Sequence, residues 1–274
     1  VTDVAALNNG TISVPYEAGS DIKTLTMATG IDKGVVSPTS TYNNTDFIQV
    51  DDRVITNATL GQTGEITFQH ALTYSLNTGF VTVAERLGNG TSITRGARDI
   101  MFNYFHDKFH LGSLTGVELA NEAAGTIISP SDPDGNAVRY SNMAFGQGMD
   151  VTMIQVAAAF SSIVNGGKYY KPTVLSGAVN ESGKYVKNKV SAPSQSVSKS
   201  TADQVRAMAH EVRSAFLTSD KESKYYIGGK TGTSQVLENG VYSDTETIAT
   251  YLGFGGSEEE SKYVIMIRVS GDGL

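Results

Sequence analysis

The sequence predicts an α+β fold, an antiparallel sheet flanked by helices. Three strand-like runs close the chain, over residues 226–236, 247–254 and 262–269, and the short connections between them favour antiparallel pairing. Patterns with helical periodicity are gathered earlier in the chain, apart from these strands. The hydrophobic fraction of 39% over 274 residues is sufficient for a substantial core.

The first half of the chain alternates helices with polar connections. Residues 20–33 read as a helix with apolar positions at Ile22, Leu25, Met27 and Ile31, and residues 35–64 as a long loop with short strands. Residues 67–86 carry two helical pieces that meet at residues 75–79. Residues 92–109 follow as a further helix with Ser92 as its expected N-cap.

The second half leads into the sheet. Residues 110–150 read as Gly- and Pro-containing connections, and residues 152–165 as a strong amphipathic helix that the following glycine pair ends. Residues 169–174 read as a strand, residues 178–200 as an exposed hairpin or loop, and residues 201–216 as a helix. The 1–19 segment is a short polar approach.

Composition excludes several classes of function. The net charge of −7 and the pI near 5.1 argue against nucleic acid as a partner, because phosphate contacts need a basic stripe. The chain has no cysteine, which excludes disulfides and thiolate metal sites, and its four histidines show no ligand spacing with a third partner. We therefore expect neither metal nor cofactor.

No apolar run approaches the roughly 18 residues that span a bilayer, and no signal-peptide pattern is present. We read the chain as an excised piece of a longer protein whose anchor lies elsewhere.

The stretch GGKTGTSQV, residues 228–236, admits two readings. A phosphate-binding loop would require a glycine at position 224, which is Lys224, and the bulky run at residues 225–227 could not wrap an anion. The residues that follow also read as a strand, whereas a phosphate loop opens a helix. The alternative is a strand that grips a carboxylate beside a reactive serine.

Ser20 and Lys23 could supply that serine and its base. Residues three apart share a helical face, so Lys23 can reach the Ser20 hydroxyl. A lysine acts as a base only when its pKa falls, through burial or through a nearby positive charge such as Lys230. Taken alone, Ser-x-x-Lys is a weak signal, because a helix cap followed by a solvated lysine has the same sequence.

Three elements in order change this reading: Ser20-x-x-Lys23, Ser75-Leu76-Asn77 and Lys230-Thr231-Gly232-Thr233. This trio resembles that of penicillin-binding proteins and serine β-lactamases. The flanking segments YEAGSDIK, ALTYSLNTGFVTVAERLG, LGSLTGVELANEAAG, AFGQGMDVTMIQVAAAFSSIVNGGKYYKP and ATYLGFGG are similar to class B penicillin-binding proteins, and the resemblance covers residues 16–269.

The chemistry gives each part a role. Ser75 can pass a proton between Ser20, Lys23 and the leaving or incoming amine, and Asn77 can hold the substrate amide. The Lys230–Thr233 strand can bind a terminal carboxylate, with Gly232 leaving the strand bare where substrate approaches. The backbone N–H groups of Ser20 and Thr233 would form an oxyanion hole.

The resemblance implies a D,D-transpeptidase domain that cross-links peptidoglycan stem peptides through a serine acyl-enzyme and that β-lactams acylate. Its expected partners are D-Ala-D-Ala stem peptides and β-lactams. Its parent would be anchored on the extracytoplasmic face of a bacterial membrane, within a complex for wall growth during elongation or division.

A helical subdomain would span roughly residues 35–165, and a sheet-containing subdomain residues 1–34 and 166–274. One alternative is a D,D-carboxypeptidase or β-lactamase on the same fold, although no loop resembles the deacylating glutamate motif of class A β-lactamases. Another is a non-catalytic β-lactam sensor or scaffold.

Two departures from the family pattern stand out. Asp21 follows the expected nucleophile where the family more often carries a small or neutral residue, and we expect its carboxyl to point away from the groove. In the family, the sheet also takes strands from the sequence before the nucleophile, and a helix follows the last strand. Here few residues precede Ser20 and no closing helix is expected. We therefore expect a fold truncated at both ends, with a reduced sheet or with strands supplied by another chain.

Overall fold

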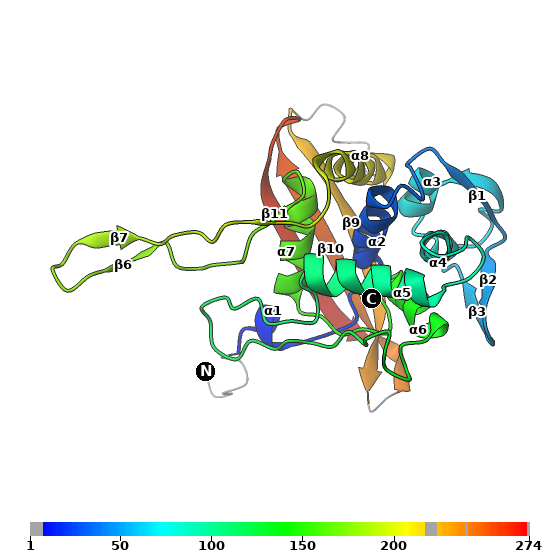
Figure 1. The fold of residues 1–274 in the computed structure, drawn as a ribbon, viewed down its shortest axis with the longest axis horizontal. Coiled ribbons are helices and arrows are strands. Elements are labelled where there is room, and N and C mark those ends of the chain that lie inside the picture. Colours follow the sequence, from blue (N-terminus) through cyan, green and yellow to red (C-terminus); the bar gives the residue numbers. More distant parts are fainter. Residues whose placement is uncertain (1–7, 217–223, 239–240, 273–274) are drawn as a thin grey trace.

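The core of the fold is a three-stranded antiparallel sheet (Figure 1). The computed structural model describes residues 8–216, 224–238 and 241–272. Strands β9 (Tyr226–Glu238), β10 (Val241–Gly256) and β11 (Ser261–Asp272) run in the order β11-β10-β9, with Thr233 opposite Ala249 and Ala249 opposite Val269. The three predicted strands and their antiparallel pairing are therefore confirmed.

Three helices lie beside this sheet (Figure 1). Helix α8 (Lys199–Phe216) packs on β9, helix α7 (Met153–Val164) contacts β11 and α8, and helix α2 (Lys23–Asp32) contacts both helices. The predicted helix at Ser20 is correct in place but begins differently, because a 3-10 turn, η2 (Gly19–Ile22), precedes α2 and contacts β9. Every residue of α2 from Lys23 to Ile31 is buried, so the helix crosses the interior.

Shorter elements make up the part of the chain between α2 and α7. Helices α3 (Phe68–Thr73) and α4 (Asn77–Arg86) confirm the two predicted pieces. The expected loop before them carries two strand pairs: β1 (Thr41–Asn44) with β4 (Gly64–Thr67), and β2 (Phe47–Val50) with β3 (Arg53–Thr56). Helix α5 (Arg95–Phe102) continues into a π-helical turn, η3 (Asn103–Lys108).

Two predictions in this region were wrong. The N-cap of α5 is Thr94 and not Ser92, because the Thr94 side chain accepts a hydrogen bond from the Ala97 N–H at 3.2 Å. The predicted connection over residues 110–150 contains helix α6 (Ala137–Met143), which Asn136 caps by accepting from the Arg139 N–H at 2.9 Å. So short a helix gives too few turns for a periodic signal to stand out.

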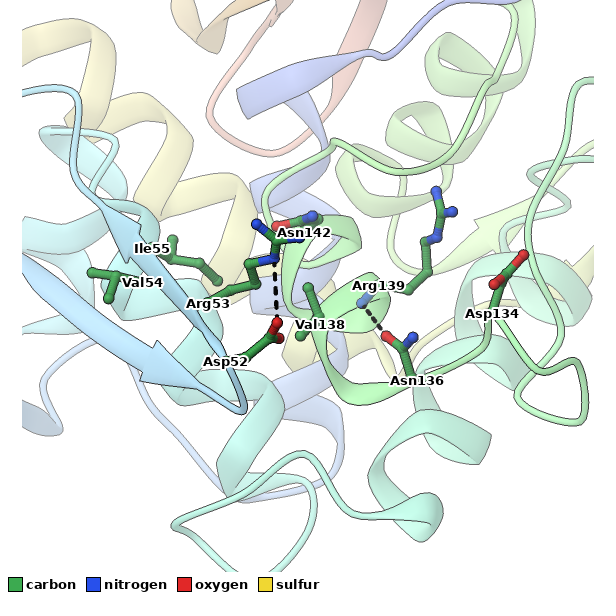
Figure 2. A pocket seen from close by; sticks show the side chains of 9 residues that line it. All are labelled: Asp52, Arg53, Val54, Ile55, Asp134, Asn136, Val138, Arg139 and Asn142. Carbon is green, nitrogen blue, oxygen red and sulfur yellow. Dashed lines mark hydrogen bonds and ion pairs between the residues drawn. The ribbon is translucent and has the colours of Figure 1, made fainter. Parts of the chain in front are cut away.

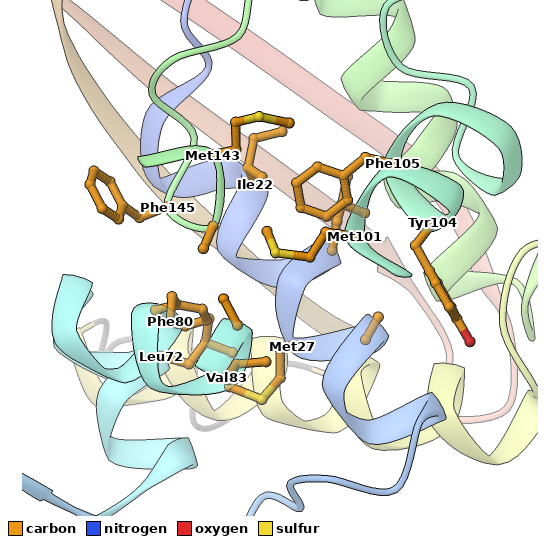
Figure 3. Close-up of a cluster of buried hydrophobic side chains, with 14 of the residues drawn as sticks. Ile22, Met27, Leu72, Phe80, Val83, Met101, Tyr104, Phe105, Met143 and Phe145 are labelled. Atoms are coloured by element: carbon orange, nitrogen blue, oxygen red, sulfur yellow. The ribbon is translucent and has the colours of Figure 1, made fainter. Parts of the chain in front are cut away.

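Apolar side chains from α2, α3, α4, α5 and α6 meet in one cluster (Figure 3). Ile22 of η2 and Met27 of α2 belong to it, and Leu72, Phe80, Met101 and Met143 contribute from the surrounding helices. Each of these side chains is fully buried. Because α2 is surrounded in this way, the start of the helix, where Ser20 and Lys23 lie, is fixed in position.

A long arm projects from the body between α7 and α8 (Figure 1). It leaves through β5 (Lys168–Tyr169), turns at the hairpin of β6 (Gly177–Val179) and β7 (Tyr185–Lys187), and returns through β8 (Ser194–Gln195). The expected hairpin is confirmed, but the strand expected over residues 169–174 ends at Tyr169. Beyond that residue the chain leaves the sheet-and-helix body, and its pairing with β8 ends.

The outer face of β11 is apolar and exposed. Tyr263, Ile265, Ile267 and Val269 alternate along the strand, and each is at least half exposed.

A short helix, α1 (Gly10–Ser13), precedes η2. In the described residues, no helix combines the length and apolar character that a bilayer crossing needs. The boundary between the two expected subdomains stays a prediction. Helix α7, which falls within the expected helical subdomain, packs beside the sheet.

Candidate active site

One cavity of about 340 Å³ brings the three sequence motifs together. Residues from η2 and α2, from the turn between α3 and α4, and from β9 line it: Ser20, Lys23, Ser75, Asn77, Thr231 and Thr233 are all among them. The three motifs lie far apart along the chain. Their convergence is the main structural finding about function.

Lys23 is the polar centre of this cavity. Its ammonium nitrogen donates to the Ser75 carbonyl oxygen at 2.7 Å, to Ser75 Oγ at 3.1 Å and to Asn77 Oδ1 at 2.8 Å. A neutral amine has only two hydrogens, so in that form the Ser75 hydroxyl can donate to the Lys23 nitrogen instead. The Lys23–Ser75 contact is thus a path along which a proton can move in either direction.

The electrostatics favour the neutral form of Lys23. The side chain is 1% exposed. Burial, followed by the charge of Lys230, holds the pKa of Lys23 well below its usual range. The Phe80 ring centroid lies 5.5 Å from the Lys23 nitrogen and adds apolar surroundings on another side. A lysine with a lowered pKa is more readily available in the neutral form that can accept a proton, as the sequence motif required.

The backbone at Ser75 is strained. Ser75 has φ of 58°, in the left-handed region that few residues other than glycine adopt. Its N–H donates to the Leu72 carbonyl and its own carbonyl accepts from Lys23, and these bonds hold the turn between α3 and α4. Strain of this kind is concentrated at functional sites, because the surrounding structure must enforce it. Here it directs the Ser75 hydroxyl at Lys23.

Asn77 is held on both sides. Its Oδ1 accepts from Lys23, and its Nδ2 donates to the Thr56 carbonyl oxygen of β3 at 2.9 Å. One amide hydrogen and one oxygen lone pair remain for other partners. A fixed amide of this kind can pair with the amide of a bound peptide.

Strand β9 presents its two faces to different surroundings. Thr231 and Thr233 are exposed and line the cavity, whereas Lys230, Gly232 and Ser234 are buried on the opposite face. Lys230 is 2% exposed and donates to the Thr231 carbonyl oxygen at 2.9 Å. Any effect of Lys230 on the cavity must therefore come through its charge, from behind the strand, whereas Thr231 and Thr233 face the cavity itself.

The reason we expected for Gly232 was wrong. A Cβ on Gly232 would collide with Thr250 Oγ1 and would lie 2.9 Å from the Ala18 carbonyl oxygen and 3.1 Å from Asp21 Cγ. The missing side chain thus makes room for the η2 segment behind β9, and not for a substrate in front of it. Asp21 is fully buried in this space and does not line the cavity, so its carboxyl does point away from the groove as expected.

The backbone of Thr233 lies beside the turn that carries Ser20. A Cβ on Gly19 would lie 2.6 Å from the Thr233 carbonyl oxygen and 3.5 Å from its nitrogen. Ser234 Oγ also donates to the Glu17 carbonyl oxygen at 2.7 Å, which ties β9 to the segment before η2. The N–H groups of Ser20 and Thr233 are therefore carried by two backbone segments in direct contact.

Several lining residues were missed in the sequence. Gly19, Ala58, Thr59, Tyr74, Phe145 and Gln147 complete the wall of the cavity. Phe145 and Gln147 belong to the run Phe145-Gly146-Gln147-Gly148, whose glycines are equally typical of a tight turn. Ala58 and Thr59 carry no sequence signal, since nothing in their types points to a binding role.

The cavity continues past Asn77. A neighbouring hollow shares Asn77, Phe145 and Gln147 with this cavity, and it shares Val54, Ile55 and Asn142 with a polar pocket of about 550 Å³. In that pocket Arg53 of β3 and Arg139 of α6 lie with Asp52 and Asp134 (Figure 2). Positively and negatively charged side chains therefore both line this polar pocket.

Together the fold and the cavity define a serine–lysine acyl-transfer site on an α+β scaffold. The chain belongs to the penicillin-binding protein transpeptidase domain family, whose family model matches residues 2–273. It is 32% identical over 258 residues to stage V sporulation protein D of Bacillus subtilis, an alignment covering 91% of this chain and 37% of that protein. It is 25% identical over 250 residues to the probable peptidoglycan D,D-transpeptidase PenA of Neisseria flavescens, covering 90% of this chain and 56% of that protein.

Solved structures agree with this assignment. The crystal structure of penicillin-binding protein 3 from Mycobacterium tuberculosis in complex with aztreonam has a TM-score of 0.85 and 25% identity, and the match covers 99% of this chain and 61% of that one. A putative peptidoglycan glycosyltransferase from Atopobium parvulum has a TM-score of 0.77 at 28% identity, covering 98% and 60%. The chain thus spans less than two thirds of each of these relatives.

Proposed function

We propose that the chain is the acylating domain of a D,D-transpeptidase, in which Ser20 is the nucleophile. The observation that carries the proposal is the contact of Lys23 with Ser75 and Asn77 in the cavity that Ser20 and Thr233 also line. A hydroxyl, a buried amine and a second hydroxyl that can relay a proton are the groups that acyl transfer through serine requires.

The reaction balances with these groups. Ser20 Oγ attacks the carbonyl carbon between the two terminal D-alanines while neutral Lys23 takes the hydroxyl proton. The N–H groups of Ser20 and Thr233 stabilise the oxyanion, which collapses with loss of the last D-alanine. The leaving amine takes the proton from Lys23 by way of Ser75, and an ester to Ser20 remains. An acceptor amine then attacks this ester, gives up a proton along the same path, and restores the Ser20 hydroxyl.

Substrate binding uses the strand and the charge behind it. The hydroxyls of Thr231 and Thr233 would hold the terminal carboxylate of the stem peptide, and Lys230 would supply a positive potential from the buried face of β9. Asn77 would hold the amide that precedes the scissile bond. A β-lactam that carries a carboxylate beside its reactive carbonyl offers the same two features, so it would acylate Ser20.

The setting of the whole protein is part of the proposal. The matched relatives include named peptidoglycan D,D-transpeptidases, so the substrate would be peptidoglycan, on the extracytoplasmic side of a bacterial membrane. The whole protein would be anchored in that membrane and would work within a cell-wall synthesis complex.

Intact mass spectrometry after incubation with benzylpenicillin tests the nucleophile. We expect a single adduct with the mass of the antibiotic on the unsubstituted protein and none on Ser20→Ala. An adduct that persists on Ser20→Ala would place the nucleophile elsewhere. Absence of an adduct on both proteins, when both are folded, would contradict the acylation step itself.

The acceptor distinguishes transpeptidation from the alternatives. The acyl-enzyme formed from a thioester analogue of the stem peptide can be offered a D-amino acid or water. Aminolysis that grows with amine concentration supports a transpeptidase, hydrolysis alone supports a carboxypeptidase or β-lactamase, and an acyl-enzyme that neither resolves supports a sensor.

A further inference from the structure

A carboxyl group is buried directly behind the strand that faces the substrate. Asp21, the residue after Ser20, is 0% exposed. Its Cγ would lie 3.1 Å from a Cβ on Gly232, so the carboxyl occupies the space that this glycine leaves free. Neither the acylation chemistry nor the substrate contacts described above use this group.

The surroundings of Asp21 give its charge little local support. Among the described residues, neither carboxylate oxygen has a partner with good hydrogen-bond geometry, and the same holds for the buried hydroxyls of Thr250 and Tyr16. A buried carboxylate without firm hydrogen bonds is costly, so its ionised form depends on a nearby cation. Burial raises the pKa of Asp21 to about 7, and the neighbouring Thr250 hydroxyl and the charge of Lys230 act against this rise.

The charged and titratable groups around Asp21 come from every element packed on η2. Strand β9 contributes Lys230, and α2 contributes Lys23, which faces the cavity. Strand β11 contributes Arg268, whose guanidinium carbon is 4.6 Å from the Tyr16 ring centroid, and the charges of Asp21 and Arg268 act in opposite directions on the pKa of Tyr16. Strand β10 contributes the uncharged Thr250 hydroxyl. Lys230 is thus the cation that couples to Asp21, and the coupling is mutual because Asp21 raises the pKa of Lys230, which burial lowers to about 8.

We propose that Asp21 is a positioning residue for acylation, whose buried carboxylate keeps Lys230 protonated behind Gly232 and thereby sets the pH range in which Ser20 reacts. The proposal rests on the acylation of Ser20 proposed above. Asp21 touches neither substrate nor the reacting atoms, and acts only through the charge of Lys230.

Two effects follow from the charge of Lys230. It attracts the carboxylate that Thr231 and Thr233 would bind, and it helps to keep Lys23 neutral and therefore basic. Ionised Asp21 preserves this charge to higher pH. At lower pH Lys230 is protonated in any case, and Asp21, whose pKa burial raises to about 7, is itself largely neutral, so its carboxyl has little effect on the cavity. Removing the carboxylate should therefore have little effect at the acid end of the pH range and slow acylation at the alkaline end.

The test is the pH profile of the second-order rate constant for acylation by benzylpenicillin, measured from about pH 5.5 to 9.5 on the unsubstituted protein and on Asp21→Asn. We expect the alkaline decline of Asp21→Asn to lie about one pH unit lower. The variant should react at a similar rate at about pH 6 and roughly three- to tenfold slower at about pH 8.5, so that the two profiles diverge only on the alkaline side. A uniform loss at all pH values, or profiles that coincide, would overturn the proposal.

Three controls make the result specific. Asp32→Asn alters a carboxyl at the far end of α2, which Tyr104, Ser198 and Thr201 hydrogen-bond, and it should leave the alkaline limb in place. Asp21→Thr is a second neutral variant, with a smaller side chain, should Asp21→Asn fold poorly. On a Lys230→Arg background, in which the cation cannot lose its proton, Asp21→Asn should no longer move the alkaline limb.

The outcome also separates this proposal from the previous one. If benzylpenicillin does not acylate the unsubstituted protein at any pH, the proposed function fails before Asp21 is tested. If it does and the alkaline limbs of the two profiles coincide, only the role of Asp21 fails. A shift that persists with Lys230→Arg would show that Asp21 acts on a group other than Lys230.

Discussion

The Gly146 carbonyl oxygen accepts a hydrogen bond from the Gly19 N–H at 2.9 Å, and the two glycine backbones are in direct contact. Gly146 has φ of 93°, and a Cβ at this position would collide with the Gly19 carbonyl group. Gly19 itself has φ of 59° and immediately precedes Ser20. The position of the proposed nucleophile thus depends on a close approach that only glycine permits.

We expect Gly146→Ala to destabilise the protein by more than about 3 kcal/mol and to abolish acylation of Ser20, because the Gly19 turn must move away. Gly90→Ala is the matched control: Gly90 has φ of 89°, but a Cβ added there would meet no atom within 4 Å. It should cost only about 1 kcal/mol, from backbone strain alone. Thermal unfolding and the rate of penicillin binding check both. Equal losses in the two variants would show that the contact with Gly19 is unimportant.

Lys23→Ala should reduce the rate constant of acylation by about 10²- to 10⁴-fold, since the proposed base is removed. Stopped-flow or quench measurements with benzylpenicillin provide the rate. Lys33→Ala, at the exposed C-terminal end of the same helix, is the control and should react at the unsubstituted rate. A Lys23→Ala protein that folds and reacts normally would exclude Lys23 as the base.

The pH dependence of acylation should be bell-shaped. Lys23 must be neutral, so acylation is present above its lowered pKa in the folded protein and is lost as the pH falls through that value. Lys230 must be charged, and burial lowers its pKa to about 8, so acylation declines as the pH rises above about 8. Rates with a carboxylate-bearing β-lactam at constant ionic strength test this. A rate that continues to rise to about pH 10 would contradict the role of Lys230.

Gly232→Ala should displace β9 from η2, because its Cβ would collide with the Thr250 hydroxyl and approach the Ala18 carbonyl to 2.9 Å. We expect a loss of stability of about 2–4 kcal/mol and slower acylation. Gly255→Ala in β10 is the control, since its Cβ would meet only Ile227 Cγ1 at 3.9 Å. Slower acylation without any change in stability would instead support a role for Gly232 on the substrate side.

Asp21 should also make stability pH-dependent. Its pKa rises from 3.8 to about 7 on folding, so its stabilising contribution is full below pH 3.8 and is lost as the pH rises to about 7. Between about pH 5 and about pH 8 this amounts to roughly 3 kcal/mol. Urea unfolding at the two pH values should show that Asp21→Asn gains stability relative to the unsubstituted protein at the higher pH. A constant difference between the two proteins would contradict the raised pKa.

Much of the fold followed from the sequence where periodic patterns are long. The helix over residues 152–165 and the three closing strands each extend over enough residues for hydrophobic periodicity to be clear. Helix α6 and strand β5 were not predicted correctly, because Ala137–Met143 and Lys168–Tyr169 are short and depend on their neighbours. Propensity is a weak guide over so few residues.

The motifs indicated which residues meet, but not how they face. Alternation along β9 establishes that Lys230 and Gly232 share one face and Thr231 and Thr233 the other, yet it leaves open which face meets the substrate. Packing decides this, since η2 lies against the Lys230 face. The role of Gly146 was equally hidden, because its partner Gly19 lies far away in the sequence.

The projecting hairpin of β6 and β7 is also a suitable site for attaching a label. Its residues are largely exposed and stand clear of the helices and the sheet (Figure 1). Because the chain contains no cysteine, Glu181→Cys at the hairpin tip would introduce its sole thiol. A fluorophore coupled there would report the rotation of single molecules, or their distance from a labelled partner, while the chemistry at Ser20 proceeds unhindered.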